Sequence, residues 1–183
     1  MAATPPARDF GWIAPSFTLP GTDGKLHAME GLAGPKGLVL MFICNHCPYV
    51  LGVLDRLKSE AEALQQIGIG VAAICANDAE AYPADSFEKM VEMAERERFP
   101  FPYLHDATQE VARVYGAACT PDFFGFNAGL ELQYRGRLDS AGKGPAGPET
   151  RRELYEAMVQ VAESGEGPAE QTPSMGCSIK WKA

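Results

Sequence analysis

The sequence has no membrane-length apolar run, no block of like charges and no excess of basic residues. Its 183 residues carry 16 Lys and Arg against 24 Asp and Glu, which gives a formal net charge of −8. This balance argues against a nucleic-acid surface and against attraction to anionic lipid. The longest apolar run is only strand-sized, well short of the about 20 residues that a membrane-spanning helix needs. We therefore expect neither nucleic acid nor a membrane as a partner.

An export signal is also missing from the beginning of the chain. Residues 1–9 have neither a basic start nor an apolar segment, so we expect no signal peptide and a cytoplasmic location. The five cysteines are an odd number. Without an export signal, they favour free or catalytic thiols over a framework of disulfide bonds. The length indicates a single domain spanning 1–183, with a core at about 10–163 and a tail at 164–183.

The most informative stretch is the Cys-Asn-His-Cys-Pro sequence at residues 44–48. It follows an apolar run at 38–43, which predicts a buried strand, and it precedes a helical pattern that extends to about residue 66. Proline is favoured at the first helical position, so Pro48 predicts a helix start with Cys47 as the N-cap. Unpaired backbone N–H groups and the helix dipole favour a thiolate there. We therefore interpret Cys47 as a redox nucleophile.

The residues around Cys47 leave alternatives open. Cys44 is either its redox partner or a small hydrophobic residue that closes the strand. His46 stabilises the thiolate, completes a Cys/His metal set with the two cysteines, or is an exposed loop residue. Three ligands so close in sequence rarely reach tetrahedral geometry unaided, so we expect no metal and no bound cofactor. Tyr49 either lines a substrate groove or packs under the tail.

The remaining sequence alternates between strand and helix patterns. The expected elements are an N-terminal hairpin at 14–27, strands at 38–43, 67–76 and 101–104, helices at 47–66, 85–98, 110–115 and 149–163, and a second hairpin at 123–138. This order predicts an α/β fold with a mixed central sheet and helices on both faces.

This order of elements, with a cysteine at the start of the first long helix and Thr120-Pro121 opening a strand, resembles the thioredoxin fold. In that family a cis-proline after Thr or a similar residue faces the active-site cysteine. The resemblance therefore implies that Thr120 and Pro121 bind substrate. The Ala14-Pro15-x-Phe17-x-Leu19 motif, the Asp23-Gly24 turn and Asn77-Asp78 are similar to the alkyl hydroperoxide reductase/thiol-specific antioxidant (peroxiredoxin) branch. The resemblance covers about residues 10–160.

More narrowly, residues 44–50 and 176–181 resemble an uncharacterised peroxiredoxin-like subgroup. A peroxiredoxin carries Pro-x-x-x-Thr/Ser-x-x-Cys, but here Leu40 and Cys44 stand at the Pro and Thr positions. The catalytic Arg of that family, near the start of the next strand, is replaced by Thr120-Pro121. Because those donors polarise the O–O bond, the resemblance implies a thiol-disulfide oxidoreductase or a weak peroxidase with antioxidant activity.

The expected function is thus thiol-dependent redox chemistry, in which Cys47 attacks a disulfide or a hydroperoxide. A second cysteine then resolves the product, and a cellular dithiol reductant, thioredoxin-like or glutathione-like, supplies electrons. The Cys-x-x-Cys spacing favours Cys44 as this partner. Cys177 is the alternative, because it lies in a Gly- and Pro-rich tail that Ile179 and Trp181 can dock onto the body. The competing hypothesis is a thioredoxin-fold binding module or metal chaperone without turnover.

Overall fold

The computed structural model describes residues 1–4 and 9–183. Residues 5–8 belong to the stretch searched for an export signal and lie outside the described residues. Within the two described ranges, every helix is too short or too polar to cross a membrane.

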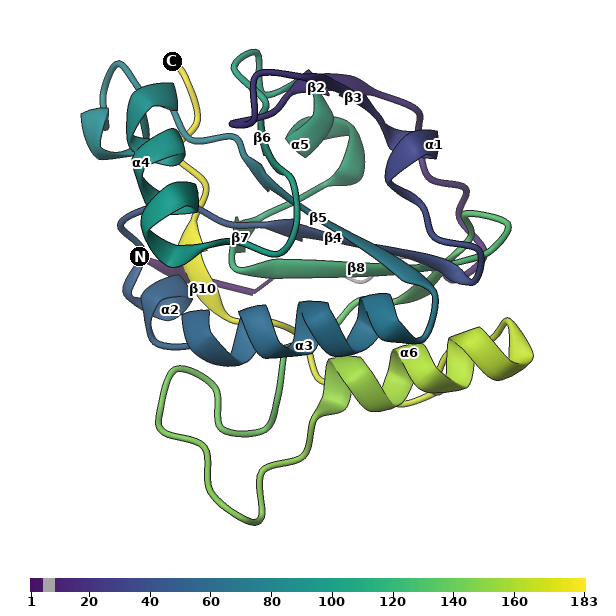
Figure 1. The fold of residues 1–183 in the computed structure, drawn as a ribbon. Coiled ribbons are helices and arrows are strands. Elements are labelled where there is room, and N and C mark those ends of the chain that lie inside the picture. The colour runs from purple at the N-terminus through teal and green to yellow at the C-terminus, as the bar shows by residue number, and fades with distance from the viewer. Residues whose placement is uncertain (5–8) are drawn as a thin grey trace.

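A mixed sheet forms the centre of the molecule (Figure 1). Strand β4 (Gly37–Phe42) pairs antiparallel with β8 (Asp122–Asn127), which in turn pairs antiparallel with β9 (Leu132–Tyr134). Strand β5 (Ile69–Cys75) lies along β4 and pairs in parallel with β6 (Tyr103–His105). The backbone N–H of Ile43 donates to the carbonyl oxygen of Ile74 at 3.0 Å, where the two halves of the sheet meet.

Helices cover both faces of this sheet (Figure 1). One face packs against α3 (Leu54–Gln66) and α6 (Glu153–Ser164). The other packs against α1 (Met29–Leu32), α5 (Glu110–Tyr115) and the N-terminal hairpin of β2 (Thr18–Pro20) and β3 (Leu26–Ala28). Helix α4 (Phe87–Glu97) adds Met90 and Met93 to the first of these cores. The predicted mixed α/β sheet with helices on both faces is confirmed.

The residues of β4 show why the sheet needs cover on both sides. Leu38, Leu40 and Phe42 point into the core beneath α1 and α5. Val39, Met41 and Ile43 point into the core beneath α3 and α6. Side chains alternate between the two faces of a strand, so a continuous apolar run can be buried only between two apolar layers. The strand therefore ends in the interior, and it delivers residues 44–47 to the edge of a rigid core.

The predicted single helix over 47–66 is wrong in one respect, because the chain forms α2 (Pro48–Leu51) and then α3. The break falls at Gly52 and Val53, where Val53 leaves helical geometry with φ −113° and ψ 1°. A Cβ atom on Gly52 would lie 2.7 Å from the carbonyl oxygen of Lys143. The loop between β9 and α6 therefore packs directly on this break.

Helix α4 also begins later than predicted. Residues Pro83–Asp85 form a short 3₁₀ turn, η1, and Ser86 then caps α4 by accepting a hydrogen bond from the Lys89 N–H at 3.4 Å. The consequence is that Asp85 lies at the end of a turn, buried against residues 44–47, instead of on a helix surface.

The tail of the chain forms a strand that the sequence did not predict. Strand β10 (Gly176–Ser178), yellow in Figure 1, lies between β7 (Cys119–Thr120) and β1 (Ala2–Ala3), antiparallel to both. Ile179 is buried, whereas Trp181 is partly exposed beneath the Arg113 guanidinium, which lies 4.5 Å from its ring centroid. The tail therefore docks mainly through its backbone.

Candidate active site

Cys47 lies where the sequence predicts, at the N-cap of α2. Its backbone is extended, with φ −72° and ψ 122°, and Pro48 is the first helical residue. The Cys47 carbonyl accepts hydrogen bonds from the N–H groups of Val50 and Leu51, both at 2.9 Å. Because α2 is only one turn long, its dipole is smaller than the sequence suggested. The groups packed around the sulfur therefore matter more.

Three of the predicted residues surround the Cys47 thiol. Its Sγ donates to the Thr120 carbonyl oxygen at 3.1 Å, and the Cys44 Sγ lies 3.4 Å from the Thr120 hydroxyl. Cys177, on β10, is directly opposite Thr120 in the β10–β7 pair. The Thr120–Pro121 peptide bond is cis. The structure thus brings together the three cysteines and the Thr-Pro pair that the sequence singled out.

The neighbouring thiols make Cys47 the most acidic member of this group. The Cys47 pKa is lowered chiefly by a hydrogen bond with Cys44; burial opposes this, and contacts with Cys177 and Thr120 reinforce it. The Cys44 pKa is raised by the same hydrogen bond, by burial and by the Asp85 carboxylate. The Thr120 carbonyl accepts from the Cys47 thiol and so favours its protonated form, whereas hydrogen bonds from Cys44, Cys177 and the Thr120 hydroxyl favour the thiolate and leave the Cys47 pKa lowered. Of the two thiols of the Cys-Asn-His-Cys loop, Cys47 therefore has the lower pKa.

The other cysteines differ in access and acidity. Burial raises the pKa of Cys177, although this residue is only partly buried. Cys75 and Cys119 are fully buried, and burial raises the pKa of both, that of Cys75 to about 12. A protonated, enclosed thiol is a poor nucleophile. Cys75 and Cys119 therefore have the character of packing residues.

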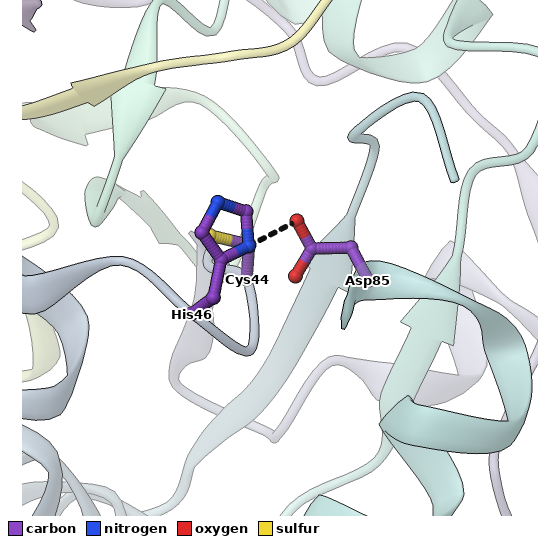
Figure 2. A group of neighbouring side chains, drawn as sticks. All are labelled: Cys44, His46 and Asp85. Atoms are coloured by element: carbon purple, nitrogen blue, oxygen red, sulfur yellow. Dashed lines mark ion pairs between the residues drawn. The ribbon is translucent and has the colours of Figure 1, made fainter. Parts of the chain in front are cut away.

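His46 points toward Asp85, and Cys44 lies beside the pair (Figure 2). Its Nδ1 lies 2.8 Å from Asp85 Oδ2, and its side chain is 37% exposed. Asp85 also accepts hydrogen bonds from the Asn45 backbone N–H at 2.8 Å and from Asn77 Nδ2 at 2.7 Å. This buried carboxylate therefore fixes both the backbone and the histidine of the Cys-Asn-His-Cys loop.

Ligand atoms of Cys44, His46 and Asp85 all lie within 4.8 Å of one another (Figure 2). One sulfur, one imidazole nitrogen and one carboxylate oxygen are donors that Zn²⁺ accepts. The sequence reasoning missed Asp85 because it is 40 residues from Asn45, and a single aspartate after a proline carries no recognisable signal.

Tyr49 lines a cavity next to the group formed by Cys44, Cys47 and Cys177. The cavity has a volume of about 340 Å³ and is bounded by Tyr49, Val53, Pro121 and the segment 172–175, among other residues. The Lys143 ammonium lies 4.8 Å from the centroid of the Tyr49 ring. Pro121 lines the same cavity as Tyr49, so the cavity adjoins the Thr120–Pro121 pair.

Solved structures that are similar to this chain over almost its whole length include two proteins. An uncharacterized conserved protein from Geobacillus kaustophilus is 43% identical over 100% of this chain and 97% of its own, with a TM-score of 0.93. A hypothetical protein from Sinorhizobium meliloti is 36% identical over 98% of both chains, with a TM-score of 0.92. A search of curated proteins found no match.

More distant structures identify the fold. The thioredoxin domain of a thiol-disulfide oxidoreductase from Bacteroides vulgatus is 12% identical, covers 85% of this chain and 99% of its own, and has a TM-score of 0.65. The predicted thioredoxin-like fold is thus confirmed. A family model described as the AhpC/TSA family matches residues 10–137. The chain, with its thioredoxin-like fold, therefore belongs to the AhpC/TSA family.

Proposed function

We propose that this protein is a thiol-dependent redox protein in which Cys47 is the nucleophile. One observation carries this proposal: the Cys47 sulfur lies at a helix N-cap, 3.1 Å from the Thr120 carbonyl oxygen, with the Cys44 sulfur 3.4 Å from the Thr120 hydroxyl and Cys177 opposite Thr120 on β10. Three convergent sulfurs supply both an acidic thiol and a second thiol within reach. Membership of the AhpC/TSA family and the thioredoxin-like fold support the same chemistry.

The reaction oxidises the protein dithiol by two electrons. The Cys47 thiolate attacks one sulfur of a disulfide, whose S–S bond breaks to give a mixed disulfide and a free thiolate. With a hydroperoxide, it attacks the terminal oxygen, the O–O bond breaks, and a sulfenic acid and an alcohol form. A second thiol then attacks the Cys47 sulfur and releases the remaining thiol or water. A cellular dithiol, thioredoxin-like or glutathione-like, reduces the resulting disulfide.

The acidity of Cys47 is the first test. Thiolate absorbance of the reduced protein, followed against pH, should show a transition well below the free-thiol pKa of about 8.5, and Cys47→Ser should remove it. Because the Cys47 pKa is lowered, the rate of reaction with a small disulfide should persist below that value and fall only as pH passes through the lowered pKa. Cys75→Ser is the matched control and should leave the transition in place. A transition near 8.5 would contradict the proposal.

The resolving thiol is the second test. We propose Cys44, because its sulfur and that of Cys47 both lie against Thr120, at 3.4 Å from the hydroxyl and 3.1 Å from the carbonyl oxygen, with Cys177 as the alternative. Peptide mapping without reductant, after mild oxidation, should give a Cys44–Cys47 crosslink that survives Cys177→Ser. A Cys47–Cys177 crosslink in the wild type would reverse this assignment. If Cys47 is found only as sulfenic or sulfinic acid, the two-cysteine mechanism is wrong.

Reversible metal binding is a second candidate function, favoured by the convergence of Cys44, His46 and Asp85. A metal there would have to replace the hydrogen bond between His46 and Asp85, and it would draw the proton from Cys44. Stoichiometric Zn²⁺ binding by the reduced protein, lost in His46→Ala but retained in Cys177→Ser, would favour this function. Weak binding that is unchanged in His46→Ala would exclude it.

A further inference from the structure

The chain's own tail occupies the backbone edge beside the cis-proline. Strand β10 pairs antiparallel with β7, Cys177 opposite Thr120 and Ser178 opposite Cys119, and the Ile179 N–H donates to the Ala118 carbonyl at 3.2 Å. An extended peptide that binds by adding a strand needs a free sheet edge. At β7 this edge is already taken.

The tail packs very closely against the backbone of β7. A Cβ atom on Gly176 would lie 2.0 Å from the Thr120 carbonyl oxygen and 2.5 Å from its carbon. Only a glycine can bring the tail this close to the backbone. On its outer side β10 pairs with β1, where Ala3 faces Gly176 and Ala2 faces Cys177.

Hydrogen bonds with the body hold the tail on both sides of β10. Before the strand, the Ser174 hydroxyl donates to the Pro121 carbonyl at 2.6 Å. After it, Gln109 donates to the Lys180 carbonyl and accepts from the Lys182 N–H, both at 2.8 Å. The Asp78 N–H also donates to the Lys180 carbonyl at 2.8 Å. The docked tail is therefore a built part of the site.

This strand also controls how an oxidant can reach Cys47. The Cys47 side chain is fully buried, and the partly exposed Cys177 lies beside it. The cavity of about 340 Å³ is lined by Pro121, next to Thr120, and by Met175, next to β10, and it can take the body of a small molecule without displacing the strand. The disulfide of a protein is carried on an extended backbone segment. To bind beside Cys47, that segment would have to pair with the edge of β7 that β10 occupies.

From this arrangement we infer that Cys47 reacts with small-molecule disulfides and hydroperoxides, and that β10 excludes protein disulfides. This inference rests on the proposed redox function and specifies its substrate class. In the exchange, Cys47 attacks a small disulfide, one thiolate leaves, and a second protein thiol displaces the other. Two electrons pass from the protein to the small disulfide, and both of its sulfurs leave as thiols.

The inference is tested by measuring the rates at which the reduced full-length protein reacts with two probes, in reactions that are quenched at set times. The probes are bis(2-hydroxyethyl) disulfide and insulin, and the products are mapped by mass spectrometry. Wild type should react with the small disulfide and about a hundredfold more slowly with insulin, as expected if the edge is free in about 1% of molecules. Gly176→Ala should raise the ratio of the insulin rate to the small-disulfide rate about tenfold, because it weakens the docking of β10 for both probes alike but frees the edge that only insulin needs.

Two further variants keep the test decisive. Gly147→Ala is the matched control, because a Cβ atom there meets nothing within 4 Å, and both rates should stay at their wild-type values. Gln109→Ala removes the hydrogen bonds to Lys180 and Lys182, so it weakens the docking of the tail at a site that does not touch Cys47. It should raise the insulin rate even if Gly176→Ala folds poorly. Equal wild-type rates for the two probes, or no gain in either tail variant, overturn the inference. If wild type reacts with neither probe through Cys47, the proposed function itself fails, and the inference fails with it.

Discussion

Replacing Cys47 by serine should reduce the rate of thiol oxidation by about three orders of magnitude or more, to the level of the protein-free reaction. A serine hydroxyl stays protonated at neutral pH, and neither Cys44 nor Cys177 can substitute, since burial raises the pKa of each even without Cys47. Single-turnover reaction of the reduced protein with a small disulfide, and separately with hydrogen peroxide, measures this loss.

The matched control for this variant is Cys75→Ser. Cys75 is as deeply buried as Cys47 but lies in β5. Its replacement should leave the rates near wild type, with at most a loss of stability. If Cys47→Ser keeps substantial activity while Cys44→Ser or Cys177→Ser loses it, the nucleophile has been assigned to the wrong sulfur.

The sequence predicts the half of the site that depends on local patterns. An apolar run that fills two cores must be a central strand, and a proline after a cysteine marks a helix start; these two facts place Cys47. Thr120 and Pro121 are found through the family resemblance. Their distance from Cys47 is fixed by the pairing of β4 with β8, which is continuous from Gly37 to Phe42.

The other half depends on contacts between distant segments, which a single sequence does not display. Strand β10 is a Gly-Cys-Ser tripeptide, too short for any periodicity, and its position is set by backbone pairing with β7 and β1. The break between α2 and α3 reflects the packing of the Lys143 loop on Gly52. Asp85 acts through three hydrogen bonds to residues elsewhere in the chain.

Asp85 gives the largest expected effect on stability. Its carboxylate is fully buried, accepts from the Asn45 N–H and Asn77 Nδ2, and lies 2.8 Å from His46 Nδ1. Asp85→Ala should lower the free energy of unfolding by about 2–4 kcal/mol, because each donor that stays buried without a partner costs about 1–3 kcal/mol and part of the loop can rehydrate. Urea unfolding of the reduced protein measures the change.

The same substitution should alter the acidity of the thiols, which a purely structural residue would not do. The Asp85 carboxylate raises the pKa of Cys44, so its removal should lower that pKa and bring it closer to the pKa of Cys47. The thiolate transition of Cys44 should therefore move to lower pH, toward that of Cys47. Asp55→Ala is the matched control: its side chain is 95% exposed and pairs with Lys58 at the surface, so stability should change little. If Asp85→Ala is no more destabilising than Asp55→Ala and leaves the thiolate transitions unmoved, Asp85 does not position the Cys-Asn-His-Cys loop.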